Sequence, residues 1–105
     1  MDNPGKYTVR AVVFPSGSHW VAQCLEYDIA TQARTRDALL VELQRIVIAH
    51  IVVAKEEHIV PFSDIPKAPK RFWEMYRGAE SREQLVAGRE LQIPTPIDVA
   101  YPKAA

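Results

Sequence analysis

The chain has 105 residues, of which 48% are apolar and 25% charged, so we expect one domain whose core needs neither metal nor disulfide. Its 13 basic and 13 acidic side chains give a formal net charge of zero, which argues against broad, non-specific binding of nucleic acid. The single cysteine, Cys24, excludes an internal disulfide and a cysteine-based metal motif.

Alternating apolar residues in the N-terminal third predict a three-stranded antiparallel meander. Residues 7–14 and 19–26 show the period of two that is typical of strands, and the Pro-Ser-Gly-Ser segment at 15–18 suits a hairpin turn. A second tight turn then leads to a short strand over 29–33.

A long helix is predicted over residues 36–57, with Thr35 as its N-cap and neither glycine nor proline inside it. One face carries a stripe expected to pack on the sheet, namely Leu39, Leu43, Ile46, His50 and Val53, joined by Leu40, Val47, Ile51 and Ala54 beside it. The far side carries a second apolar stripe, namely Val41, Ile48 and Val52. A helix that is apolar on two sides must be covered on both, so we expect the tail or a second chain to cover this stripe.

Prolines interrupt the C-terminal part of the chain. Three of them within residues 61–69 predict an extended, ordered connection, and a short helix over 70–77 follows the last of them. Residues 81–87 favour another turn or two of helix. The apolar segment 97–101 favours a late edge strand.

The first half of the chain resembles a known family. Residues 20–33, with the sequence Trp-Val-Ala-Gln-Cys-Leu-Glu-Tyr-Asp-Ile-Ala-Thr-Gln-Ala, precede Thr35 and a helix and look like the signature of HicB-like antitoxin domains. The match covers residues 7–54. Segments 61–62 and 68–76 resemble the tail of stand-alone HicB-like bacterial proteins, and no ribbon-helix-helix or helix-turn-helix pattern follows the long helix.

This resemblance implies a fold similar to the first part of a ribonuclease H domain, which is a three-stranded meander crossed by a helix, often with a further strand beside the first. It also implies homo-oligomers and a protein partner, since full antitoxins of the family bind HicA, a small RNA-cleaving toxin. We therefore expect a single α+β domain over 1–105, with its core in 7–58 and an extension in 59–105. The polar N-terminus favours a cytoplasmic location, with no membrane partner.

The segment 67–77 interleaves basic and aromatic residues: Lys67, Lys70, Arg71, Phe72, Trp73, Tyr76 and Arg77. The three-four spacing of its aromatic residues places them on one side of a helix, which suits docking on the domain or, alternatively, stacking on RNA bases. Docking is the favoured interpretation. The candidate partner-binding residues are Val41, Ile48, Val52, Lys70, Arg71 and Trp73.

Catalytic chemistry has one weak candidate. Glu26 and Asp28 lie two residues apart at a strand end and could hold a divalent metal, as in a divergent nuclease, although solvation of a tight turn is the favoured interpretation. The three histidines, His19, His50 and His58, lack zinc-type spacing, and no base is identifiable for Cys24 as a nucleophile. We therefore expect a non-enzymatic binding protein without catalytic residues, cofactor or metal.

Overall fold

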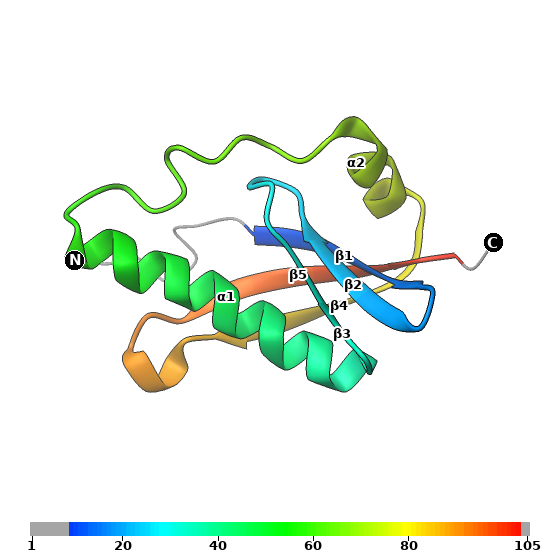
Figure 1. Ribbon diagram of the computed structural model, residues 1–105, viewed down its shortest axis with the longest axis horizontal. Coiled ribbons are helices and arrows are strands. Elements are labelled where there is room, and N and C mark those ends of the chain that lie inside the picture. The colour runs from blue at the N-terminus through cyan, green and yellow to red at the C-terminus, as the bar shows by residue number, and fades with distance from the viewer. Residues whose placement is uncertain (1–8, 104–105) are drawn as a thin grey trace.

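Five strands form one mixed sheet within residues 9–103, the part of the chain that the computed structural model describes. Their bounds are β1 (Val9–Ser16), β2 (His19–Cys24), β3 (Ala30–Ala33), β4 (Ala79–Ala87) and β5 (Thr95–Pro102). The spatial order is β3-β2-β1-β5-β4, and every neighbouring pair is antiparallel except β1 and β5, which run parallel (Figure 1). The α+β class and the antiparallel meander of the first three strands are thus confirmed; residues 7 and 8 of the predicted first strand lie outside the described part.

Helix α1 (Arg36–Glu56) crosses one face of this sheet, which confirms the predicted long helix (Figure 1). The Thr35 hydroxyl accepts a hydrogen bond from the backbone N–H of Ala38 at 3.1 Å, so the predicted N-cap is present. Asp37 places a negative charge in the first turn, where the helix dipole favours it. The start of the helix therefore follows from its local sequence.

The buried row of α1 agrees with the predicted core stripe except at Ile48 and Val53. Its buried residues are Leu39, Leu43, Val47, Ile48, Ile51 and Ala54. The prediction placed Val53 in the core, and this is wrong, because the Val53 side chain is more than half exposed. The buried row advances in steps of four from Leu39 through Val47 to Ile51, in keeping with a period of 3.6 residues.

The short helix α2 (Lys70–Arg77) packs against the opposite face of the sheet, on β1 and β5. Successive β1 side chains alternate between the two faces, and those in the core beneath α1 are Val9, Ala11 and Val13. On the other side, Phe14 stacks on Phe72 of α2 with ring centroids 6.3 Å apart, and Val12 is fully buried. Helix α2 is therefore not the part of the tail that covers the second stripe of α1, because its apolar contacts are with the sheet.

The last two strands depart most from the sequence predictions. Residues 81–87, expected to form helix, lie in β4 instead, where they pair antiparallel with β5. The strand expected over 97–101 is present, but its expected edge position is wrong, because β5 lies between β1 and β4. Ile97, Val99 and Ala100 are fully buried, as is usual for a strand covered on both faces. Pairing with β5 thus overrides the local preference of 81–87 for helix.

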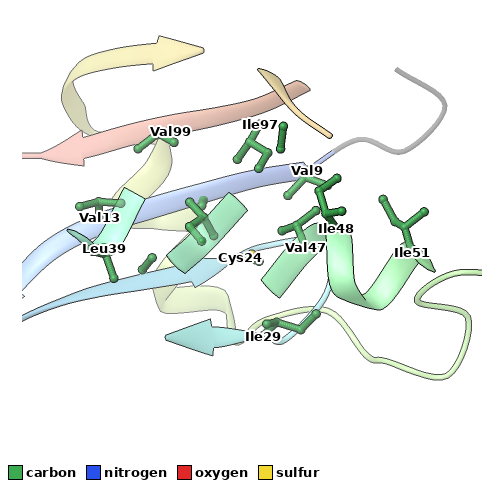
Figure 2. Close-up of a cluster of buried hydrophobic side chains, with 14 of the residues drawn as sticks. Val9, Val13, Cys24, Ile29, Leu39, Val47, Ile48, Ile51, Ile97 and Val99 are labelled. Atoms are coloured by element: carbon green, nitrogen blue, oxygen red, sulfur yellow. The ribbon is translucent and has the colours of Figure 1, made fainter. Parts of the chain in front are cut away.

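The main core lies between α1 and the sheet, and Figure 2 shows side chains of both meeting there. Among its members are Val9, Val13, Cys24, Leu39, Val47, Ile51, Ile97 and Val99. A smaller buried group outside this core comprises Val12, Leu25, Ala68 and Ala100. Within residues 9–103, neither helix combines the length and the apolarity that crossing a bilayer requires.

The connection between the two helices is held along the turn that joins β2 to β3. The backbone N–H of Asp28 donates to the Pro66 carbonyl at 2.7 Å, and the N–H of Ala68 donates to the Leu25 carbonyl at 2.9 Å. Figure 1 shows this connection running from the end of α1 around to the far face of the sheet, where α2 begins. The two hydrogen bonds attach it to the β2–β3 turn just before α2.

Candidate protein-binding surfaces

The two carboxylates singled out from the sequence are bound within the domain. Glu26 accepts hydrogen bonds from the backbone N–H of Arg10 at 2.8 Å and from its Nε at 2.5 Å. Asp28 accepts one from the side-chain amide of Gln23 at 2.8 Å. Among the described residues, no group of three or more His, Cys, Asp or Glu side chains could hold a metal ion. This geometry supports a structural role for both carboxylates and lends no support to the nuclease alternative.

Cys24 is buried, and His50 is partly buried and held by contacts within the domain. Burial and, to a smaller extent, the charge of Glu26 raise the pKa of the Cys24 thiol to about 12, so the thiol is protonated at neutral pH. His50 Nδ1 lies 2.8 Å from the Ile46 carbonyl, and its ring stacks on Phe62 with centroids 5.8 Å apart. The Cys24 thiol is thus buried and protonated, and the partly buried His50 ring is held by contacts within the domain.

The aromatic side of α2 is occupied by contacts with the sheet. The guanidinium of Arg10 lies 5.0 Å from the centroid of the Trp73 ring and 5.7 Å from that of Tyr76, which are distances typical of cation–π contacts. Trp73 Nε1 donates a hydrogen bond to the Ala68 carbonyl at 3.2 Å. The exposed cations of this segment are Lys67, Lys70, Arg71 and Arg77. The geometry thus favours docking over base stacking for the aromatic residues.

The predicted second stripe of α1 is not one continuous surface. Val41 is more than half exposed, whereas Ile48 is buried and Val52 is partly buried against the core. Of the candidate residues on α2, Lys70 and Arg71 lie on the opposite face of the sheet from this stripe. The six candidate partner-binding residues predicted from the sequence therefore do not form one surface.

One exposed apolar surface is a groove between α1 and the turn that joins β4 to β5. This turn contains the short 3₁₀ helix η1 (Arg89–Leu91), and the groove has a volume of about 440 Å³. We call it the α1–η1 groove; its lining includes Val41, Arg45, Ile48, Val86, Glu90 and Leu91. Figure 1 shows the orange turn beside the green helix.

Gly88 allows this turn to approach α1 closely. Its φ of +79° lies in the left-handed region, which favours glycine, and a Cβ at this position would lie 2.7 Å from Cδ1 of Ile48. The side chain of Ile48 therefore fills the space that any other residue at position 88 would need, and it forms the buried part of the groove.

A second exposed apolar surface lies at the C-terminal end of α1. It consists of Val53, Ile59 and Val60, each more than half exposed, together with the exposed acidic residues Glu56, Glu57 and Asp64. We call these six residues the α1-end surface. Beside it lies a shallow pocket of about 270 Å³ whose lining includes Val53, Ile59 and Asp64. Exposed apolar residues beside acidic ones form a surface suited to binding another protein.

Sequence reasoning missed most of these residues. Val53 was assigned to the core, and Ile59, Val60 and Leu91 were not considered. Ile59 and Val60 could have been recognised from the sequence. They are adjacent apolar residues between the end of a helix and Pro61, so no helix or strand is available to bury them. No family model, curated protein or solved structure matches this chain.

Proposed function

We propose that this chain is a cytoplasmic, non-catalytic protein-binding domain of the HicB-like antitoxin type, and that it binds a small RNA-cleaving toxin through the α1-end surface. The observation that carries the proposal is the composition of this surface, in which Val53, Ile59 and Val60 are exposed beside Glu56, Glu57 and Asp64. Three acidic side chains beside an apolar patch suit a partner that presents basic groups around an apolar contact.

An RNA-cleaving protein has such a surface for a physical reason. It must neutralise phosphates with Lys and Arg side chains to hold its substrate. An acidic surface that covers those cations blocks the RNA and attracts the toxin in the same step. The apolar residues at the centre then supply the affinity, because they leave water on binding.

The arrangement of the elements supports the same proposal. The meander β1–β3 is followed by α1 across one face, and a further strand, β5, lies beside β1. This is the arrangement that the resemblance to HicB-like domains and to the first part of a ribonuclease H domain leads us to expect. The proposed toxin class rests on the resemblance, and the proposed contact residues rest on the composition of the α1-end surface.

The test uses a HicA-like toxin, with calorimetry for affinity and toxin-catalysed RNA cleavage for inhibition. Ile59→Ser should weaken binding by more than about 10-fold, because full burial of such a side chain is worth about 1.5–3 kcal/mol. Glu56→Lys should mainly lower the association rate and its dependence on salt.

Leu91→Ser is the matched control, since Leu91 and Ile59 are both 53% exposed but lie on different surfaces. It should leave affinity and inhibition unchanged. Failure of the wild-type chain to bind or inhibit the toxin would refute the proposal. Equal losses in Ile59→Ser and Leu91→Ser would show that the α1-end surface is not the binding site.

Direct RNA binding is the second candidate, favoured by the exposure of Lys67, Lys70, Arg71 and Arg77 on one short segment. Its test is the fluorescence anisotropy of a labelled single-stranded RNA titrated with the chain alone. We expect no saturable binding, because the aromatic rings of α2 are packed on the sheet. Saturable binding that Arg71→Glu abolishes would place RNA binding first, and cleavage of the same RNA would revive the nuclease alternative.

A further inference from the structure

The shallow pocket beside the α1-end surface, which we call the α1-end pocket, is small and mostly apolar. Four of the six described residues that line it are apolar, namely Ala49, Val53, Ala54 and Ile59. The other two are His50 and Asp64. Its volume of about 270 Å³ lies below the range of about 300–1,000 Å³ that is typical of sites for small-molecule ligands. The pocket therefore suits a single side chain of a partner better than a whole cofactor.

Backbone hydrogen bonds hold the segment after α1 against the helix and so form the pocket in the free chain. The N–H of Ile59 donates to the Ala54 carbonyl at 3.0 Å, which joins two lining residues directly. The N–H of Ile65 donates to the Phe62 carbonyl at 3.1 Å, in a turn that contains Asp64. Because these contacts are already made, binding does not have to order the lining.

The ring of His50 is held in one orientation. Its Nδ1 lies 2.8 Å from the Ile46 carbonyl, and a carbonyl oxygen only accepts, so Nδ1 carries a proton. Buried Phe62 stacks on this ring with centroids 5.8 Å apart, and Tyr27 stacks on Phe62 at 4.0 Å. The pocket thus has an aromatic ring of fixed orientation in an otherwise apolar lining.

The charge at this end of α1 is negative. Glu56, Glu57 and Asp64 are exposed there and carry three negative charges, against the one positive charge of Lys55. Carboxylates so placed attract a cationic side chain to the mouth of the pocket.

We propose that the α1-end pocket binds an arginine side chain of the protein partner. The aliphatic part of the arginine lies against Val53 and Ile59, and the guanidinium lies at the His50 ring and donates to the Asp64 carboxylate. Arginine fits better than lysine, because its planar guanidinium is weakly hydrated and packs on aromatic rings, whereas the ammonium group is compact and strongly hydrated. This inference rests on the proposed function, since it names the group that anchors the partner at the α1-end surface.

The test needs no toxin. The full ¹⁵N-labelled chain is titrated with the capped tripeptide Gly-Arg-Gly, and amide signals are followed by NMR. Signals of Val53, Ile59 and Asp64 should shift saturably, with a Kd on the order of 1–10 mM, because one exposed side chain makes few contacts. The same peptide with lysine, or with citrulline, which has the shape of arginine without its charge, should bind at least about 3-fold more weakly.

Asp64→Asn should weaken binding of the arginine peptide by at least about 3-fold, because it removes the charge that the guanidinium meets. Glu90→Gln is the matched control, since Glu90 is also an exposed carboxylate but lies in the α1–η1 groove, and it should bind as wild type does. The amide spectrum of each free variant shows whether its fold is intact. Absence of saturable shifts, equal binding of the lysine or citrulline peptide, or equal losses in the two variants would overturn the inference.

The toxin assays separate this inference from the proposed function. If wild type binds the toxin but not the arginine peptide, the inference is wrong and the proposed function stands. If wild type binds the arginine peptide at these residues but not the toxin, the pocket is supported and the proposed function is refuted.

Discussion

Arg10 illustrates how polar side chains in this domain are bound internally. Its Nε donates to Glu26, and its guanidinium lies over the rings of Trp73 and Tyr76. Within the described residues, no buried side-chain nitrogen or oxygen lacks a hydrogen-bond partner. Polar groups of this kind stabilise the fold and leave recognition to the exposed apolar and charged residues.

The Cys24 thiol should be unreactive in the folded protein. It is buried, and its raised pKa keeps it protonated at neutral pH, whereas alkylating reagents need an accessible thiolate. We expect iodoacetamide to label Cys24 at least ~100-fold more slowly in buffer than in denaturant, because only opened molecules react. Mass spectrometry of timed samples measures this. Comparable rates in the two conditions would show that the thiol is accessible.

Gly88 should be the glycine most sensitive to substitution. Gly88→Ala combines a left-handed backbone, worth about 1–2 kcal/mol, with overpacking against Ile48 and the Ile93 carbonyl, worth about 1–3 kcal/mol. Gly17→Ala is the matched control, since Gly17 also has positive φ but a Cβ there meets nothing within 4 Å. Urea unfolding measures both. If Gly88→Ala and Gly17→Ala lose equal amounts of unfolding free energy, then the side chain of Ile48 moves aside from the new Cβ without measurable cost.

At the scale of elements, α2 depends on tertiary contact for its stability. It has eight residues, no side-chain N-cap and no buried residue, so it is too short to be stable alone. Its aromatic side holds it against the sheet. Its exposed side carries Lys70 and Arg71, which contribute charge and not packing.

Trp73→Ala should therefore destabilise the whole domain. Trp73 is partly buried, so we expect a loss of about 2 kcal/mol, below the usual cost of deleting a fully buried aromatic side chain. Lys70→Ala, on the exposed side of the same helix, should change the unfolding free energy by less than about 0.5 kcal/mol. Thermal or urea unfolding of both variants decides the matter. A stable Trp73→Ala protein would mean that α2 is not needed for folding.

At the scale of the whole molecule, Tyr101 connects three elements. The Tyr101 hydroxyl donates to Glu83, which joins β5 to β4, and the guanidinium of Arg36 at the start of α1 lies 5.3 Å from the centroid of its ring. Burial, and then the hydrogen bond to Glu83 and its charge, raise the pKa of Tyr101 to about 12. The neutral phenol is thus the form that the folded state favours.

Stability should consequently fall in alkali. A pKa raised above its usual value of 10 means that this contribution is fully present below about pH 10 and is lost as the pH rises to about 12. Urea unfolding across this range should show a steeper decline for wild type than for Tyr101→Phe. Both proteins contain Cys24, whose titration therefore cancels in the comparison. Parallel declines would show that the Tyr101 proton is not linked to folding.

The sequence by itself determined the first three strands, α1 with its Thr35 cap, and the bounds of α2. Each of these follows from a local signal, because apolar periodicity, capping and proline placement act over a few neighbouring residues. Residues 81–87 lacked such a signal. Their pattern suits a helix or a strand, and only the presence of β5 alongside them made the strand the more stable choice.

Tertiary structure alone decided which residues were left exposed. Packing of α1 on the sheet left Val53 exposed and buried Ile48, the reverse of the sequence prediction for both residues. The docking of α2 on the far face of the sheet left the α1–η1 groove open, and Gly88 brought the opposite side of that groove close to α1. These outcomes depend on contacts between segments distant in sequence, and local patterns cannot specify them because they do not encode which surfaces meet.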